Sequence, residues 1–380
     1  MSGGSTNPVS SGAHAVRTAS RADTLESLNI TLEVPLRALT ISANGGLDRL
    51  EYRTDLPIPE VSAGQVRVRV AAAALNHLDL FMLQGLPGAT LRPPWILGAD
   101  ATGTVDAIGE NAKARLMIGD RVIINPGISD GVCEYCRAGE QSLCIHFGIL
   151  GEHHPGTLAE YVVVPATNLR RIPESIPQEE AAAYTLAALT AWRMIVTRAK
   201  VVPNDDVLIW GIGGGVALAA LSIVKQIGAR AWVTSSSDEK LAKARELGAH
   251  ETLNYRTTDV GKEIRARTGK RGVSVVIDSV GQDTWKQSLM ALGKRGRLVT
   301  CGGTSGPMVE TDIRRLFWNQ WTIMGSTMGN DGEFDSVAKE FTSGRLGPII
   351  DSVYDLENGR DAFTRLASGE QFGKIVVRVA

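Results

Sequence analysis

The stretch that decides the fold is VLIWGIGGGVALAALSIVKQIG, residues 207–228. Its first four apolar residues predict a buried strand, and the apolar residues after the glycines recur at helical spacing. Four glycines lie between the two elements: Gly211, Gly213, Gly214 and Gly215. Val216 is the first residue of the predicted helix. Glycines allow a tight turn and a close backbone approach to a pyrophosphate, to which the helix N-terminus offers free N–H groups. The pattern, which fits G-x-x-G-x-x-A better than G-x-G-x-x-G, predicts a dinucleotide-binding turn.

Strands and helices alternate from this turn onward. Helical segments separate six apolar segments that we predict to be strands. These strands are VLIWG, ARAWVTSS, ETLNY, VSVVIDSV, RLVTCG and WTIMGS. Such alternation predicts a doubly wound parallel sheet of the Rossmann type. The half before it is different, because QVRVRVAA (65–72) and AEYVVVP (159–165) alternate with period two between Gly- and Pro-rich turns. We therefore expect an α/β protein with a separate β-rich domain, to which the final strand GKIVVRV (373–379) returns.

The composition bounds the function. The 380 residues suggest about two domains. Lys and Arg number 40 against 41 Asp and Glu, so there is no basic excess to attract nucleic acid. No apolar run approaches the ~18 residues of a membrane-spanning helix. We expect a cytoplasmic protein whose partner is a small molecule, with neither nucleic acid nor membrane. Residues 1–35 are rich in Ser, Gly and Ala, which predicts a disordered extension, an organelle transit peptide being the alternative.

The end of the second strand bears on the choice of cofactor. About 20 residues after the glycine turn, an acid binds the ribose 2′-hydroxyl of NAD, whereas small or basic residues accommodate the 2′-phosphate of NADP. Here the sequence is VTSSSDEK (233–240). Ser235 stands at the acid position, Ser236 offers a donor to phosphate oxygens, and Lys240 reaches back from the next helix. The pattern favours NADP(H) over NAD.

Three of the four cysteines fall within twelve residues. Their spacing is Cys133-x2-Cys136-x7-Cys144. Asp130 precedes Cys133 with the same spacing of two intervening residues. Three thiolates and a carboxylate make a closed tetrahedral ligand set for Zn²⁺. We predict a structural zinc lobe at about residues 127–147, with a metal-free relic as the alternative.

Together these features resemble the medium-chain dehydrogenase/reductase superfamily, which contains zinc-binding alcohol dehydrogenases and quinone oxidoreductases. The resemblance covers residues 36–380 and rests on the features above and four motifs: LNHLDLFMLQG (75–85), ILGADATGTV (96–105), GTLAEYVVVP (156–165) and LTAW (189–192). It implies a GroES-like β-barrel catalytic domain of residues 36–180 with 330–380, and a Rossmann domain of residues 181–329. It also implies a homodimer joined through the edge strand in WTIMGS.

The family's catalytic zinc ligands are missing from this sequence. By resemblance, the first Cys position is Asn76, the His–Glu pair is Ala99–Asp100, and the second Cys position is Leu186. The usual residues therefore cannot hold a Lewis-acid zinc. An unusual site is an alternative, assembled from Asp100 with three histidines: His77, His153 and His154.

Quinones and α,β-unsaturated carbonyls accept hydride without a metal, and the family's quinone oxidoreductases carry Asn-x-x-Asp where this chain has Asn76 and Asp79. The resemblance implies that Asn76 donates to a carbonyl oxygen. Asp79 has a catalytic or a loop-bracing role, and His77 and His153 are candidates for the proton step. The leading hypothesis is an NADPH-dependent quinone or enone reductase. The alternatives are an alcohol or aldehyde dehydrogenase with an atypical metal site, and a dinucleotide-binding structural or sensor protein with little turnover.

The resemblance also supplies further cofactor contacts. Thr190 of LTAW would lie beside the nicotinamide, and Tyr255 with Lys240 would hold the 2′-phosphate. Two more segments would face the cofactor through the following residues: Cys301 and Gly302 at a strand end, and Phe372 and Lys374 in QFGKIVV.

Overall fold

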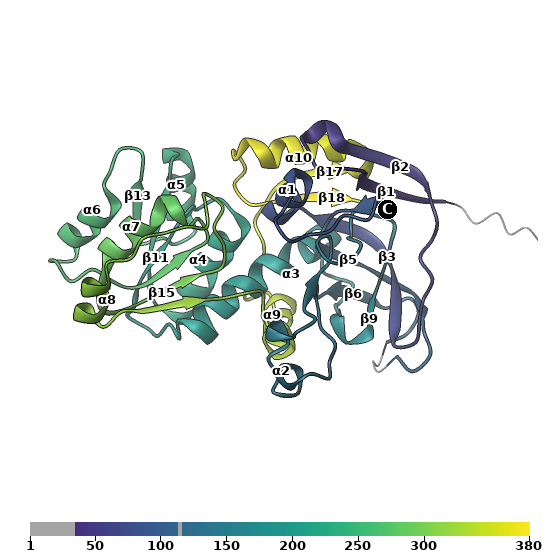
Figure 1. Cartoon of the computed structure of the whole chain (residues 1–380), viewed down its shortest axis with the longest axis horizontal. Helices are drawn as coiled ribbons and strands as arrows, with labels where there is room; N and C mark the ends of the chain where they lie inside the picture. The colour runs from purple at the N-terminus through teal and green to yellow at the C-terminus, as the bar shows by residue number, and fades with distance from the viewer. Residues whose placement is uncertain (1–34, 113–115) are drawn as a thin grey trace, which may run out of the picture. The chain divides into compact units, whose positions relative to one another are not determined.

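β3 (Gln65–Ala74) organises the first half of the chain in the computed structural model, which describes residues 35–112 and 116–380 (Figure 1). Alternate valines, Val66, Val68 and Val70, are fully buried, as the period-two pattern predicts. β3 pairs with β5 (Asp100–Ile108) on one side and with β18 (Lys374–Arg378) on the other, both antiparallel. The predicted extension lies almost entirely outside the described residues.

Further strands join β3, β5 and β18 in this β-rich part, which also contains the short pair β7 (Gly127–Ile128) and β8 (Gly148–Ile149). The seven-stranded sheet runs β10-β6-β5-β3-β18-β17, with β9 also paired to β3, and its remaining strands are β6 (Arg121–Ile124), β9 (Tyr161–Pro165), β10 (Leu169–Arg171) and β17 (Ile350–Asp355). A second sheet is formed by β1 (Leu36–Ile41), β2 (Leu50–Leu56) and β4 (Trp95–Ile96). The C-terminal strands therefore pair with the N-terminal half of the chain. α1 (His77–Gln84) follows β3 directly, and α10 (Gly359–Ser368) lies between β17 and β18.

The second half is a six-stranded parallel sheet in the order β13-β12-β11-β14-β15-β16. Its strands are β11 (Asp206–Ile209), β12 (Arg230–Ser235), β13 (Glu251–Asn254), β14 (Val273–Asp278), β15 (Leu292–Thr300) and β16 (Thr322–Gly325). The connecting helices are α4 (Gly215–Ile227), α5 (Asp238–Glu246), α6 (Val260–Arg267), α7 (Gln282–Ala291) and α8 (Ile313–Asn319). The strand order reverses between β11 and β14, which is where doubly wound sheets bind nucleotides.

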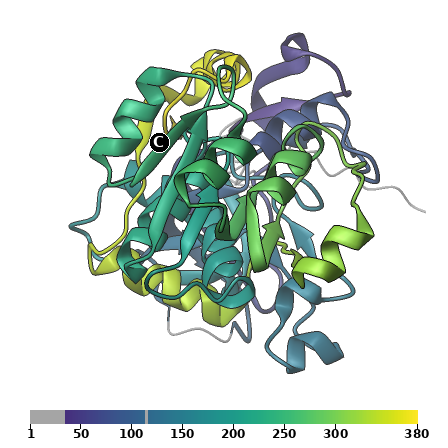
Figure 2. The same cartoon turned by 90° about the vertical axis from the view of Figure 1, so that its left-hand side faces the viewer.

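Both faces of this sheet are buried (Figure 2). Val207 and Ile209 of β11 pack in the cluster that holds α4, whereas Leu208 packs on the opposite face with Trp232 and residues of α6 and α7. Burial on both faces explains why these strands read as continuous apolar runs. The predicted fold class, a GroES-like β domain with a Rossmann sheet, is confirmed. The predicted domain boundaries stay a prediction.

α3 (Gln178–Trp192) packs against α4 and also against β3 and β5. The apolar run 178–199 has the length of a single helix, but the α-helix ends at Trp192 and the chain continues as a π-helical turn, Arg193–Arg198. α9 (Asp331–Thr342) also packs on α3, and Phe341 stacks on Tyr184 at 4.7 Å between ring centroids. Among the described residues, none of the helices is long and apolar enough to cross a membrane.

Candidate functional site

The glycine turn links β11 to α4 through two residues with positive φ angles, Gly211 at +69° and Gly213 at +126°. The backbone N–H of Ile212 donates to the Thr234 carbonyl at 2.8 Å, which ties the turn to β12. α4 begins at Gly215 after Gly214, and no side chain caps its N-terminus. The first-turn N–H groups are therefore free to bind an anion, as a dinucleotide pyrophosphate requires.

The C-terminal segment lies against this turn. The N–H of Gly373 donates to the Gly213 carbonyl at 2.9 Å, and the Gln371 carbonyl lies 3.3 Å from where a Cβ atom on Gly213 would stand. The side-chain Oε1 of Gln371 is buried and has no hydrogen-bond partner among the described residues. A glycine turn with uncapped N–H groups, beside a buried acceptor without a donor, fits a bound dinucleotide.

At the end of β12, serines stand where an acid would bind the ribose of NAD. Ser235 is buried and its Oγ accepts the Ser237 N–H at 3.2 Å, whereas Ser236 is partly exposed. Lys240 passes beside Gly213, and its Nζ donates to the Gly369 carbonyl at 2.7 Å. The two acids that follow in α5 are engaged elsewhere: Asp238 accepts from Asn254, and Glu239 pairs with Lys243.

The remaining predicted cofactor residues are spread over several elements. Tyr255 is exposed, and its N–H donates to the Ser235 carbonyl at 3.1 Å. Thr190 is buried, with Oγ1 3.8 Å from the Met328 sulfur. Burial raises the pKa of the Cys301 thiol to about 12, so this thiol stays neutral, and Gly302 beside it is exposed. Phe372 is half-buried and its ring lies 5.8 Å from the Lys243 ammonium.

Three buried polar side chains meet where β3, β5 and β18 converge: Asn76, Asp100 and Lys374, here named the lysine site. Lys374 Nζ donates to Asn76 Oδ1 at 2.6 Å and to Asp100 Oδ2 at 2.8 Å, and Asn76 Nδ2 donates to Asp100 Oδ2 at 2.9 Å. The Asp100 side chain is 0% exposed and that of Lys374 is 5% exposed. Such a pair is tolerated in the protein interior only because each charge finds its counterpart.

α3 completes the environment of Asp100. The Thr185 hydroxyl and the Leu186 backbone N–H, the latter at 2.6 Å, both donate to Asp100 Oδ1. Asn76, Asp100 and Leu186 occupy the positions where the family resemblance places zinc ligands or their acidic neighbour. The structure therefore gathers these positions around an ammonium group, and the Leu186 side chain offers no ligand atom.

The predicted catalytic residues around Asn76 have separate environments. Asp79 is buried and accepts the N–H groups of Asn76 at 2.7 Å and Gly98 at 3.0 Å. Burial raises its pKa to about 6. These contacts brace the start of α1, which was one of the two roles expected of Asp79. The Asn76 amide N–H is engaged by Asp100 rather than left free for a carbonyl.

Among the described residues, neither His77 nor His153 forms a hydrogen bond or ion pair with Asn76, Asp100 or Lys374. His77 opens α1 and is accessible to solvent; desolvation and the nearby charge of Lys374 lower its pKa. His153 is exposed, and its Nδ1 accepts the Ile149 N–H at 3.3 Å and lies 3.8 Å from Glu152. A proton-transfer role for either histidine stays a prediction.

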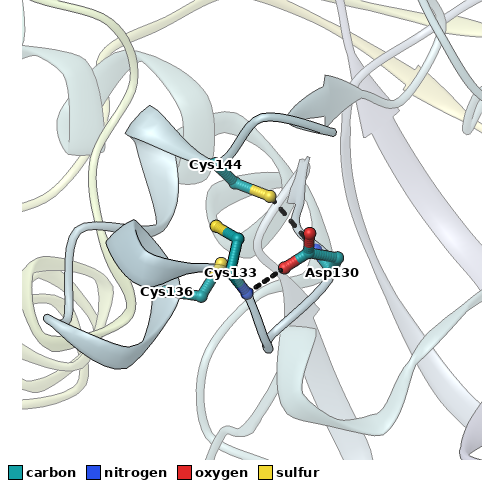
Figure 3. Close-up of side chains that lie close together, drawn as sticks. All are labelled: Asp130, Cys133, Cys136 and Cys144. Carbon is teal, nitrogen blue, oxygen red and sulfur yellow. Dashed lines mark hydrogen bonds between the residues drawn. The ribbon is translucent and has the colours of Figure 1, made fainter.

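The cysteine lobe, which comprises Asp130, Cys133, Cys136 and Cys144, is shown in Figure 3. The four potential ligand atoms lie within 4.8 Å of one another. Asp130 Oδ1 accepts the Cys133 N–H at 3.0 Å, and the Asp130 N–H points to the Cys144 sulfur at 3.4 Å. These contacts fix the carboxylate beside the sulfurs. Three sulfurs and one oxygen at this separation fit a tetrahedral Zn²⁺.

A buried arginine connects the lobe to the rest of the chain. Arg193, at the start of the π-helical turn, donates to Glu140 at 2.7 Å and to Glu333 at 2.8 Å, and is itself 4% exposed. Glu140 lies between α2 (Glu134–Arg137) and the 3-10 turn that precedes Cys144, whereas Glu333 caps α9. No local sequence pattern indicates this network, because its three members are far apart in the chain.

Comparison with known proteins identifies the family. A family model described as "Alcohol dehydrogenase GroES-like domain" matches residues 62–174, and one described as "Zinc-binding dehydrogenase" matches residues 215–343. A solved structure titled "NAD-dependent alcohol dehydrogenase" has a TM-score of 0.86 and 42% identity, covering 90% of this chain and 100% of that chain.

Two curated relatives carry different activities in their names. An "NAD-dependent alcohol dehydrogenase" of Sulfolobus acidocaldarius is 32% identical over 352 residues, 90% of this chain and 100% of the relative. An "Acryloyl-coenzyme A reductase" of Sulfurisphaera tokodaii is 28% identical over 325 residues, 85% and 95% of the two chains. The chain belongs to the medium-chain dehydrogenase/reductase superfamily and is an oxidoreductase, as its sequence motifs predicted.

Proposed function

We propose that this oxidoreductase transfers hydride from NADPH to a quinone or an α,β-unsaturated carbonyl compound, with no metal ion at the reacting carbonyl. The observation that carries the proposal is the lysine site. The positions that bear zinc ligands or their acidic neighbour in the family's alcohol dehydrogenases are here Asn76, Ala99, Asp100 and Leu186. Their one carboxylate is already bound by the ammonium of Lys374 at 2.8 Å. A metal cation would have to displace this ammonium and would still lack soft ligands.

Conjugated carbonyl compounds suit such a site because the electrons of the arriving hydride are delocalised onto the carbonyl oxygen. A bound nicotinamide cofactor supplies the hydride. The free N–H groups of α4 would hold its pyrophosphate, and Gln371 Oε1 would accept from one of its donors. The relative named acryloyl-CoA reductase supports this choice of substrate class, since acryloyl-CoA is itself an α,β-unsaturated thioester.

The preference for NADPH belongs to the same proposal. Ser235 takes the place of the acid that binds the NAD ribose, and Lys240 stands beside the turn. Two similar proteins are named NAD-dependent, so a direct comparison of the two cofactors is required. We also propose that the cysteine lobe binds one structural Zn²⁺ per chain, and the cytoplasmic location stays a prediction.

A homodimer is the proposed assembly. β16 pairs with β15 on one side only. α8 and the segment before it expose five large apolar side chains: Met308, Val309, Ile313, Phe317 and Trp318. An unpaired strand edge beside an apolar surface favours association with another copy.

The runner-up is an alcohol dehydrogenase with an atypical metal site, and the names of the two NAD-dependent relatives favour it. The discriminating experiment measures oxidation of NADPH and NADH by purified protein with 1,4-benzoquinone, cyclohex-2-enone or an aldehyde, and the reverse reaction with an alcohol, each with and without a chelator. We expect chelator-insensitive oxidation of NADPH with the quinone or the enone. Rapid chelator-sensitive alcohol oxidation would refute the proposal, and NADPH binding without turnover would favour the non-catalytic alternative.

A further inference from the structure

The side chain of Lys374 connects the cofactor turn to the lysine site. Its backbone follows Gly373, which is hydrogen-bonded to Gly213 of the turn. Its aliphatic stem runs along Gly215, where an added Cβ atom would meet Lys374 Cδ at 2.8 Å. Its ammonium then reaches Asn76 and Asp100, which come from the other half of the chain. The cation is thus placed by the same segment that lines the predicted cofactor site.

The ammonium has one donor left over. Of its three N–H groups, two donate to Asn76 Oδ1 and Asp100 Oδ2, and the described residues provide no third acceptor within hydrogen-bond distance. The carboxylate of Asp100 is wholly buried and has no free acceptor position for a substrate. It accepts from four donors: Asn76 Nδ2, Lys374 Nζ, Thr185 Oγ1 and the Leu186 N–H. Lys374 and Asn76, in contrast, each retain a small exposed fraction.

Asn76 is less suited to act on a substrate oxygen than its resemblance to the family's Asn-x-x-Asp motif implied. Its Nδ2 group donates to Asp100 at 2.9 Å and points to the Ala74 carbonyl at 3.4 Å, and its Oδ1 accepts from Lys374. The amide is therefore used at both ends. Its effect is to hold the ammonium in place.

We propose that Lys374 is a catalytic residue: its third N–H donates to the carbonyl oxygen of the substrate, and its charge stabilises the oxyanion that forms during hydride transfer. This rests on the proposed function. A preorganised donor aimed at a developing oxyanion in a site with little water is a strong source of rate enhancement. Asn76 and Asp100 are positioning residues that fix the ammonium and balance its charge. An ammonium supplied by the chain thus takes the electrostatic role of the metal.

The step balances for an enone. The C–H bond at C4 of the reduced nicotinamide breaks, and its electron pair forms a new C–H bond at the substrate β-carbon. The π electrons of the C=C bond shift to make an enolate, whose oxygen carries the negative charge beside Lys374. The cofactor is oxidised by two electrons, and the enone is reduced by two. A proton from water then completes the saturated ketone.

The test compares Lys374→Met with Lys374→Arg and with Lys262→Met, a matched change at an exposed lysine of α6. Single-turnover hydride transfer is measured with saturating NADPH and whichever of 1,4-benzoquinone or cyclohex-2-enone the wild type reduces faster. We expect Lys374→Met to slow the step by about 100- to 1000-fold. Its NADPH Kd, from protein fluorescence, stays within about threefold of the wild-type value. Lys374→Arg recovers part of the rate, and Lys262→Met matches the wild type.

Removing the ammonium alone leaves Asp100 buried without its counter-ion, which destabilises the chain. The double variant Lys374→Met/Asp100→Asn removes both charges, so it tests the proposal if the single variant does not fold. It is expected to show the same loss of rate with a melting temperature near that of the wild type.

A normal hydride-transfer rate in either variant would overturn the proposal. So would a loss that appears entirely as a weaker NADPH Kd, because Lys374 would then serve the cofactor rather than the carbonyl. If the wild type reduces neither probe, it is the proposed function that fails.

Discussion

The cysteine lobe and the lysine site are the two positions where a metal would be expected from the sequence and its family resemblance, and their side chains differ in chemistry. The lobe gathers three sulfurs and a carboxylate within 4.8 Å, and the imidazole of His146 lies 3.0 Å from that carboxylate. The lysine site gathers an amide, a carboxylate and an ammonium, with Leu186 at the fourth position. The fold is the same family fold in both places, but only the lobe presents a ligand set that suits zinc.

The two sites also differ in what faces the carboxylate. At the lysine site, the carboxylate that would face a metal faces Lys374 instead, and both are nearly or wholly buried. A divalent ion would bring two further positive units close to the ammonium, at a large electrostatic cost in the interior. In our proposal, the site therefore keeps its electrostatic role without a metal ion.

The largest expected effect comes from breaking the lobe with Cys133→Ser. Loss of one of three thiolates lowers zinc affinity and leaves the remaining ligands without a metal to hold them. We expect the zinc content to fall about tenfold and the melting temperature to fall by roughly 10 °C. Hydride transfer by the folded protein should change far less. Cys301→Ser, outside the lobe, is the control that keeps its zinc; equal zinc in both variants would contradict the assignment.

The next effect comes from the arginine that joins the lobe to α9. Arg193→Met leaves Glu333 buried without its cation, and such a change costs about 3–5 kcal/mol of unfolding free energy. Urea denaturation measures it. Arg345→Met, which breaks an exposed ion pair with Glu340, serves as the control and is expected to change stability little. A similar small loss for both variants would show that Arg193 does not anchor the lobe.

A third prediction concerns Asp79, which lies next to the lysine site and makes the stability of the chain depend on pH. Its pKa is raised from 3.8 to about 6 in the folded chain, so the folded state holds the proton more tightly than the unfolded state. Its contribution to stability is therefore present below about pH 4 and is lost as pH rises through about 6. Relative to Asp79→Asn, the wild type should lose roughly 3 kcal/mol across this range. A difference that stays constant with pH would contradict the raised pKa.

The smallest expected effect concerns the cofactor. Ser235→Asp places a carboxylate where the 2′-phosphate of NADPH would bind, while NADH can still use its ribose hydroxyl. We expect the ratio of kcat/KM for NADPH to that for NADH to fall about tenfold, which is about 1.4 kcal/mol. Ser237→Ala, at the cap of α5, is a neighbouring control that adds no charge. An unchanged ratio would remove the basis for NADPH preference.

Local patterns predicted most of the fold. The sequence of residues 207–228 predicted a strand, a turn and a helix, because burial of the strand and of one helix face leaves a periodic apolar pattern. The cysteine lobe was also predicted from the sequence, since its four residues fall within fifteen positions. Lys374 appeared among the candidate cofactor residues, but its contacts with Asp100 and Asn76 span 274 and 298 positions, and no local pattern encodes them.

The end of α3 shows the same limit. The run 178–199 is uniformly helical in pattern, yet a π-helical turn begins at Arg193. That residue is held by Glu140 and Glu333 from two distant segments. A tertiary network of this kind overrides local propensity, and only the folded chain reveals it.

The zinc content of the purified wild-type protein, measured by plasma mass spectrometry per mole of chain, tests the central claim most directly. One zinc per chain is predicted, held by the cysteine lobe, with none at the lysine site. Two zinc ions per chain, with the second retained in Cys133→Ser, would contradict the claim that Lys374 has replaced the catalytic metal.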